Sequence, residues 1–285
     1  MLTDVLIRVM RQEDLAFAAE CTAAEGWLSE NLTTLEGFYL RDPTGCLLAE
    51  REGQPVGMCV ATFYGKSGFI GELIVRPEAR GYGIGAALVN HGVRWLKKRG
   101  SETVYLDGVL KAVDLYERNG FRKICRSWRF SNQLTGEQSS QVRRMTERDL
   151  PEVFALDRAS FGAERSFFLR RRLELFPELC QVMVAGGRLI GYIQGRRSEG
   201  WASAGPWVAT EEATEPELLL KAFANEVGDV SISTGILDVN HRAVELVRSL
   251  GFVENPDSPW RMALGRSGDL GASPRCYAVG SAAKG

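Results

Sequence analysis

The chain has 285 residues, a formal net charge of −1, and 45% hydrophobic against 25% charged residues, which is the composition of a globular protein with a real core. The near-zero charge provides no basic field for nucleic acid or an anionic membrane. No apolar run reaches the roughly 18 residues of a membrane-spanning helix. We therefore expect a cytoplasmic protein, a monomer or homodimer, that binds a small molecule but neither nucleic acid nor membrane.

The cysteines and histidines argue against disulfide and metal chemistry. The six cysteines are scattered without C-x-x-C spacing, so we expect reduced, mostly buried thiols. The two histidines, His91 and His241, are far apart in sequence and have no second ligand nearby. We expect no bound metal and a mechanism without a histidine-based triad.

The first predicted element is a short strand that runs into a helix, and it occurs twice. RVMRQEDL at 8–15 recurs as RRMTERDL at 143–150, PVGMCVATF at 55–63 recurs as LIGYIQGR at 189–196, and LYERNGF at 115–121 recurs as LVRSLGF at 246–252. Each copy, of about 130 residues, has the size of one domain. The order within a copy is strand, two helices, antiparallel strands, helix, strand, helix and closing strand.

This order predicts an α/β fold with a mixed sheet in each copy. The polar segment SNQLTGEQSSQ at 131–141 has little to bury and marks the boundary between the copies. We therefore expect domains at 1–135 and 142–265, followed by a C-terminal tail at 266–285.

Farther along the first copy, a glycine-rich loop joins a strand to a helix. GFIGELIV at 68–75 predicts a strand, which Pro77 ends, and the segment from Ala86 to Arg99 has apolar residues at helical spacing with basic residues in its last turn. The glycines at 81, 83 and 85 therefore precede a helix N-terminus, where unpaired amides favour an anion. Arg80 adds a cation to this predicted phosphate site.

Three kinds of phosphate ligand compete for the loop. A Walker loop is excluded because no Gly-Lys-Ser/Thr follows the glycines. A dinucleotide turn fits Gly81-x-Gly83-x-x-Ala86, with Asp107 at the end of the next strand, but such a turn follows its strand directly, whereas residues 76–80 intervene here. The third alternative takes the whole run of strand, VRPEARGYGIG, helix, strand and LYERNGF.

This run resembles the GNAT superfamily of N-acetyltransferases, whose Arg/Gln-x-x-Gly-x-Gly/Ala motif matches the segment from Arg80 to Gly85. The resemblance covers both halves of the chain and is to tandem GNAT proteins of the bacterial YitH type. It implies two acyl-CoA N-acyltransferase domains, of which the first uses acetyl-CoA as a co-substrate.

By this resemblance, the loop amides would hold the cofactor pyrophosphate, and the preceding strand would pair with the pantetheine arm. A bulge and a splay there would leave an amide free to polarise the thioester carbonyl. The implied cofactor-binding residues are Leu73, Ile74, Val75, Arg80, Gly81, Tyr82, Gly83, Ile84, Gly85 and Ala86. Val109 stands where the family often has Asn, so Asp107 or Lys111 would have to contact the pantetheine arm instead.

The resemblance also implies direct attack of an amine on the thioester, with Tyr116 in the place of the general acid. A phenol could protonate the departing thiolate in a late transition state, with a modest gain. Glu72, the only acid on the cofactor strand, is the candidate base. Glu25, Trp27 and Glu30 fall in the segment that lines the acceptor pocket of the family, although each also fits a solvated acid or a packing aromatic.

The activity expected is acetyl transfer to an amine of a small molecule, and the acids near the acceptor segment favour a cationic one. Neither the acceptor nor the acyl chain preference can be derived from the sequence. The alternative is a non-catalytic module that senses coenzyme A or an acyl-CoA. The presence of Tyr116 at the position of the general acid favours the enzyme over this sensor.

The second copy lacks the residues of this site. Arg80, Gly83, Gly85 and Tyr116 correspond to Ala213, Pro216, Leu218 and Val247, and Glu211, Glu212, Glu215 and Glu217 crowd the counterpart of the loop. Acids at a helix N-terminus would repel phosphate. We therefore expect a degenerate domain with a structural or acceptor-pocket role, although its Asn240 matches the family's Asn. In the tail, Cys276 to Val279 are apolar enough to dock.

Overall fold

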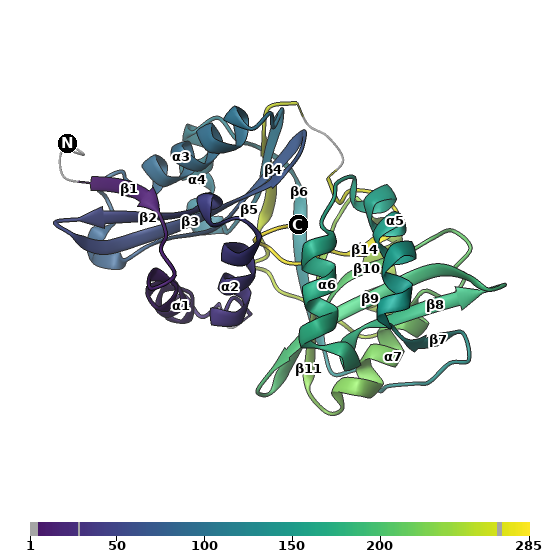
Figure 1. Cartoon of the computed structure of the whole chain (residues 1–285). Helices are drawn as coiled ribbons and strands as arrows, with labels where there is room; N and C mark the ends of the chain where they lie inside the picture. The colour runs from purple at the N-terminus through teal and green to yellow at the C-terminus, as the bar shows by residue number, and fades with distance from the viewer. Residues whose placement is uncertain (1–4, 28, 267–269) are drawn as a thin grey trace. The chain divides into compact units, whose positions relative to one another are not determined.

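The computed structural model describes residues 5–27, 29–266 and 270–285, which form two compact units (Figure 1). Among these residues, unit 1 takes those up to Ile124, a short stretch that begins at Met262, and Lys284. Unit 2 takes the others. No described helix has the length and apolar character needed to cross a bilayer.

Unit 1 is a mixed sheet with helices on both faces. Its elements are β1 (Val5–Val9), α1 (Asp14–Ala24), α2 (Leu32–Arg41), β2 (Cys46–Arg51), β3 (Gln54–Tyr64), β4 (Ser67–Val75), α3 (Ile84–Lys98), β5 (Thr103–Gly108), α4 (Val113–Arg118) and β13 (Trp260–Leu264). The strand order is β1-β2-β3-β4-β5-β13, with β4 and β5 parallel. The pairs from β1 to β4 are antiparallel. Figure 1 shows α1 and α2 on one face and α3 and α4 on the other.

Two glycines let α3 lie close to the sheet of unit 1. If Gly68 of β4 carried a side chain, its Cβ would lie 2.7 Å from the Leu96 side chain on α3. A Cβ at Gly92 of α3 would come within 2.7 Å of the Ile70 side chain on β4. Leu96 and Leu88, on the inner face of this helix, are both fully buried. The close packing holds the N-terminus of α3 at a fixed position beside the end of β4.

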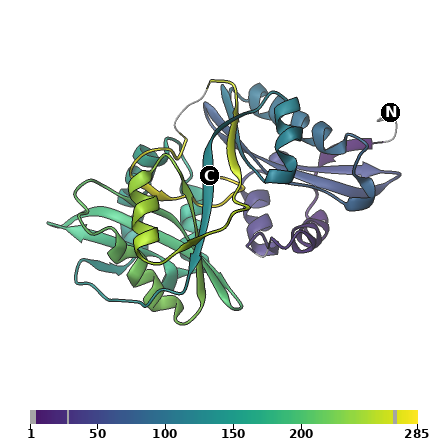
Figure 2. The same cartoon turned by 180° about the vertical axis from the view of Figure 1, so that it is seen from behind.

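Unit 2 repeats this architecture. Its elements are β6 (Arg122–Asn132), β7 (Val142–Arg144), α5 (Leu150–Phe161), α6 (Ser166–Leu175), β8 (Gln181–Ala185), β9 (Arg188–Ser198), β10 (Trp201–Ala209), α7 (Glu217–Val227), β11 (Ser231–Leu237), α8 (His241–Ser249), β12 (Val253–Glu254) and β14 (Cys276–Ala278). The strand order is β7-β8-β9-β10-β11-β6, with β10 and β11 parallel; in addition, β12 pairs with β6 and β14 with β10. Figure 2 shows unit 2 from behind.

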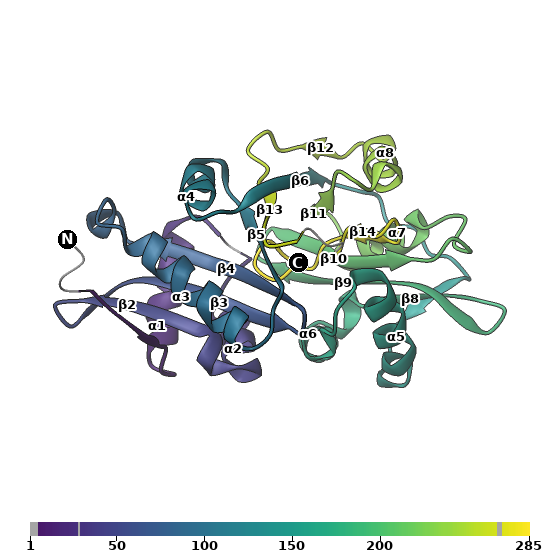
Figure 3. The ribbon, with the colours of Figure 1, turned by 90° about the horizontal axis from the view of Figure 1, so that it is seen from above.

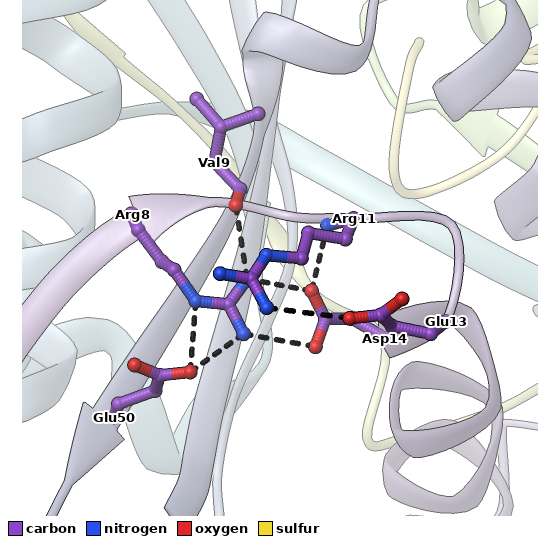
Figure 4. Close-up of polar contacts among 6 residues, drawn as sticks. All are labelled: Arg8, Val9, Arg11, Glu13, Asp14 and Glu50. Atoms are coloured by element: carbon purple, nitrogen blue, oxygen red, sulfur yellow. Dashed lines mark hydrogen bonds and ion pairs between the residues drawn. The ribbon is translucent and has the colours of Figure 1, made fainter. Parts of the chain in front are cut away.

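The turn from the first strand to the first helix has the same ion pair in both units. In unit 1, Arg8 on β1 donates to both carboxylate oxygens of Asp14, at 2.6 and 3.0 Å, and to Glu50 at 2.8 Å (Figure 4). In unit 2, Arg143 donates to both oxygens of Asp149, at 2.8 and 2.6 Å. These pairs fall on the repeated segments RVMRQEDL and RRMTERDL, so the duplication seen in sequence is a duplication of structure.

The strand that closes each sheet comes from the other half of the chain. β6 follows α4 of the first copy but pairs antiparallel with β11 of unit 2, from Ser127 opposite Leu237 to Asn132 opposite Ile232. β13 follows the second copy but lies next to β5 of unit 1. The sequence-based division at 135 and 142 assigned each of these strands to its own copy, whereas the compact units change near Ile124 and Met262.

Candidate active site

The strands β4 and β5 of unit 1 separate at their carboxyl ends. They pair at Ser67 with Thr103, Gly68 with Val104 and Phe69 with Tyr105. Among the described residues no later pair joins them, although β4 continues to Val75 and β5 to Gly108. The backbone of both strand ends is therefore available to a ligand, at the edge where open α/β sheets bind their substrates.

A bulge in β4 accompanies the separation. Val60 of β3 lies opposite Gly71, whereas Met58 lies opposite Ile74, so Cys59 faces two residues of β4. One of these, Glu72, has a φ of 49°, which is unusual for a residue other than glycine. The structure thus contains the bulge and the splay that the GNAT resemblance implied. The extra residue interrupts the hydrogen bonds between β3 and β4 and changes the direction in which the neighbouring backbone amides point.

The glycine loop follows the end of β4 and opens α3. Gly81 and Gly83 have φ values of +86° and +78°, which favour glycine. The bond from the Ala87 amide to the Gly83 carbonyl, at 3.0 Å, is an opening hydrogen bond of the helix, so the amides of residues 84–86 precede its internal ladder. A Cβ at Gly81 would meet no atom within 4 Å. Open space beside free amides fits a pyrophosphate.

Two cations near the loop share one carboxylate. Arg80 donates through Nε to the Val75 carbonyl at 2.8 Å and through Nη2 to Glu25. Lys111, which follows β5, donates to the other oxygen of Glu25 at 2.6 Å. The bond from Lys111, supported by Arg80, holds the pKa of Glu25 below its usual range. An anionic ligand at the loop would compete with Glu25 for these cations.

Tyr116 packs at the end of β5. Its side chain is buried, its ring makes an edge contact with Phe121 at 6.0 Å, and a Cβ at Gly108 would lie 3.0 Å from the ring. Burial raises the pKa of the Tyr116 hydroxyl, with a smaller contribution from the nearby Cys59 thiol. The phenol is therefore protonated at neutral pH and can donate a hydrogen bond.

Cys59 connects Tyr116 with the bulge. Cys59 is fully buried, and burial raises the pKa of its thiol, with further contributions from Cys46 and Glu72. Cys59 therefore lies within electrostatic range of Tyr116 and of Glu72. Glu72 is 3% exposed. Sequence reasoning singled out Tyr116 and Glu72 but missed Cys59 and Gly108, since a lone buried thiol and a strand glycine carry no motif.

The remaining predicted residues lie around this centre. Ile74 is buried, whereas Leu73 and Val75 are half-buried. Tyr82 is exposed, and the Arg51 guanidinium lies 4.5 Å from its ring. In the segment between α1 and α2, Trp27 is half-buried and Glu30 is buried and accepts a hydrogen bond from Ser29 at 3.1 Å, whereas Glu25 faces the cations of the loop. Their roles toward cofactor and acceptor stay predictions.

Family models match both halves of the chain. Residues 10–121 match the acetyltransferase (GNAT) family, and residues 153–277 match an acetyltransferase (GNAT) domain. The chain therefore belongs to the GNAT family. It is a tandem GNAT protein of the YitH type, with a mixed sheet in each unit.

Its relatives are acyltransferases. The chain is 26% identical to holothin acyltransferase of a Pseudoalteromonas species over 85% of this chain and 82% of that protein. It is 24% identical to the uncharacterized N-acetyltransferase YitH of Bacillus subtilis over 70% of this chain and 72% of that protein. It is 36% identical to mycothiol acetyltransferase of Stackebrandtia nassauensis, but over only 41% of this chain and 40% of that enzyme.

Solved structures agree on the fold. A putative acetyltransferase from Pyrococcus horikoshii superposes with a TM-score of 0.83 at 23% identity, covering 100% of this chain and 97% of that chain. A tandem GNAT protein from the clavulanic acid biosynthesis pathway superposes with a TM-score of 0.64 at 16% identity, covering 93% of this chain and 100% of that chain. At these identities the likeness concerns the fold.

Proposed function

We propose that unit 1 transfers an acetyl group from acetyl-CoA to an amine of a small molecule, by direct attack and without a covalent enzyme intermediate. The observation that carries this proposal is the separation of β4 and β5 at the bulge, beside a glycine loop and close to Tyr116, which packs against Gly108 of β5. The relatives named for holothin and for mycothiol support a small-molecule acceptor.

The cofactor would enter with its pyrophosphate at the glycine loop and its pantetheine arm between the two strand ends. The residues proposed for it are the ten from Leu73 to Val75 and from Arg80 to Ala86. An amide released by the bulge at Glu72 would donate to the thioester oxygen as negative charge develops there. Because Glu25 holds Arg80 and Lys111, cofactor phosphates would take over these cations when they bind.

In the reaction, the amine nitrogen bonds to the thioester carbon, the carbon–sulfur bond breaks, and a proton passes from nitrogen to sulfur. We propose that Glu72 accepts the proton from nitrogen and that Tyr116 donates toward the departing sulfur. Because burial raises the pKa of Tyr116, complete transfer to a thiolate of reference pKa near 8.5 is uphill. Tyr116 therefore stabilises the developing thiolate mainly by hydrogen bonding until the proton from nitrogen arrives.

Replacing Tyr116 by phenylalanine tests this role. Tyr116→Phe should lower kcat by roughly tenfold or more, because a hydrogen bond to a charged group contributes about 1.5–3 kcal/mol, while the Kd for acetyl-CoA changes less than about twofold. Turnover is measured as thiol release with a panel of small primary amines. Tyr105→Phe, at another buried tyrosine of the same unit, is the control for loss of a buried hydroxyl.

An unchanged kcat in Tyr116→Phe would remove this residue from the mechanism. Saturable binding of acetyl-CoA without turnover of any amine in the panel would favour the sensor instead, a module that binds an acyl-CoA without catalysis.

A further inference from the structure

Unit 2 contains the same separation of parallel strands as unit 1, but a strand of the chain itself lies in it. β10 and β11 pair from Trp201 with Ser231 to Ala204 with Thr234. Beyond this point β10 pairs with β14 instead, Trp207 opposite Ala278. Figure 3 shows β14 beside β10.

The backbone of the C-terminal segment is bonded to both strands. The Val279 amide donates to the Gly235 carbonyl of β11 at 2.8 Å, and the Ala209 amide of β10 donates to the Arg275 carbonyl at 3.0 Å. The segment therefore occupies the position between β10 and β11 that corresponds to the proposed pantetheine position between β4 and β5. It does so by strand addition, the mode proposed for the cofactor arm.

Asn240 holds the same segment by its side chain. Its Nδ2 donates to the carbonyls of Pro274 and Cys276, at 3.0 and 3.1 Å, while its Oδ1 accepts from the Ala243 amide at the start of α8. Asn240 is the residue that matches the family's Asn, whose counterpart in unit 1 is Val109. In unit 2 this amide group is fully engaged with the chain's own backbone.

The segment packs closely against both strands. A Cβ at Gly205 of β10 would lie 2.2 Å from the Val279 carbonyl oxygen, and a Cβ at Gly235 would lie 2.9 Å from the Val279 side chain. Tyr277 is 1% exposed, and its ring centroid lies 4.9 Å from that of Trp207. Gly205 and Gly235 on the two strands, together with Trp207 against which Tyr277 of the segment packs, thus form a groove shaped to this segment.

The end of the segment reaches the counterpart of the acceptor side. Arg165 directly precedes α6, as Asn31 directly precedes α2 in unit 1, and its guanidinium donates to the Gly285 carbonyl at 2.9 Å. The same guanidinium forms an ion pair with the buried Asp157, with an N–O distance of 2.7 Å, and the Tyr192 hydroxyl donates to that carboxylate. The Gly280 amide also donates to the Gly285 carbonyl, at 2.9 Å.

We propose that the former active-site channel of unit 2 is a strand-binding groove whose ligand is this chain's own C-terminal segment, from Pro274 to Gly285 except Lys284, which belongs to unit 1. The segment takes the place of both the pantetheine arm and the acceptor. The proposal accounts for the retention of Asn240 in a copy that has lost the counterparts of Arg80 and Tyr116. It also means that unit 2 binds no acetyl-CoA while the segment is in the groove.

Asn240→Asp in the full chain tests the proposal. An Asp still caps α8, because one of its oxygens accepts the Ala243 amide, but its other oxygen faces the Pro274 and Cys276 carbonyls, to which Asn240 Nδ2 donated two hydrogen bonds. The segment should detach more often. The readouts are the rate of iodoacetamide alkylation at Cys276, which is buried with its pKa raised to about 12, and trypsin cleavage after Arg275.

Cys180 is the internal control, because it is buried in the same unit and burial raises the pKa of its thiol to about 12 as well. The proposal expects Asn240→Asp to increase alkylation of Cys276 by about tenfold or more with Cys180 unchanged. An unchanged rate at Cys276, or an equal increase at both thiols, would overturn it, since the segment would then be an inseparable part of the core.

A second measurement uses a chain that ends at Ser273. A synthetic peptide of residues 274–285 should bind this chain with one site and raise its Tm. Peptide binding that persists unchanged in the Asn240→Asp background would contradict the groove. If the shortened chain does not fold, the alkylation ratio in the full chain decides alone.

Discussion

In the site that we propose for acetyl-CoA, Glu25 would compete with the cofactor for two cations, so Glu25→Gln should strengthen cofactor binding. Its carboxylate pairs with Arg80 and Lys111, whose side chains are 46% and 68% exposed. Because both cations are solvated, each pair stabilises the unliganded protein by only about 0.2–1 kcal/mol. Loss of both pairs therefore removes about 1 kcal/mol of stabilisation from the unliganded protein. This corresponds to a roughly fivefold lower Kd for acetyl-CoA.

Isothermal titration with acetyl-CoA at low and at high salt measures this effect. The gain should shrink at high salt, because screening weakens exposed charge pairs. Glu20→Gln is the matched control, since Glu20 lies on α1, which Glu25 directly follows, and pairs with the partly exposed Arg76 at 3.1 Å. A Kd that is unchanged or higher in Glu25→Gln would refute the competition and would favour a direct role of this carboxylate in binding.

Two further predictions concern Tyr116 and the duplicated ion pair. Gly108→Ala places a Cβ 3.0 Å from the Tyr116 ring, so kcat should fall several-fold with an unchanged Kd for acetyl-CoA; an equal fall in the Tyr116→Phe background would contradict this cause. Arg143 lowers the pKa of Asp149 to about 2, so this pair should stabilise the fold above the unfolded pKa of about 3.9 and lose its effect as the pH falls toward 2. Asp149→Asn should therefore cost about 1–2 kcal/mol in urea unfolding at pH 6 but much less at pH 2.5, and an equal cost at both values would contradict the assignment.

The conformation of the glycine loop could be predicted from the sequence because its causes are local. Glycines with positive φ, a helix N-terminus and an adjacent cation all lie within the segment from Arg80 to Gly85. The duplication could also be predicted, since the ion pairs of Asp14 and Asp149 lie in sequence segments that repeat. Tyr116 followed from a short motif in the same half of the chain.

The strand that closes each sheet could not be predicted. β6 and β13 each follow the last helix of their own copy, and both sheets present a similar parallel strand, β5 or β11, beside which either could lie. The alternation of side chains along a strand specifies which face is buried but does not specify the sheet. The pairing of Glu25 with Lys111 could not be predicted either, because it joins segments far apart in sequence.

The tail was expected to be apolar enough to dock, and Cys276 to Val279 are indeed buried in unit 2. Its place between β10 and β11 depends on Gly205, Gly235 and Asn240, which come from three different elements. No local pattern in the tail carries that information.

The number of acetyl-CoA sites on the chain tests the central claim most directly. Asp tolerates the positive φ of Gly83 better than most residues and would place a carboxylate at the phosphate site, whereas Asp at Pro216 merely caps α7. Titration should therefore give one site per chain, abolished by Gly83→Asp and retained in Pro216→Asp. Two sites in the unaltered chain, or binding that survives Gly83→Asp and is lost in Pro216→Asp, would contradict the assignment of the cofactor to unit 1.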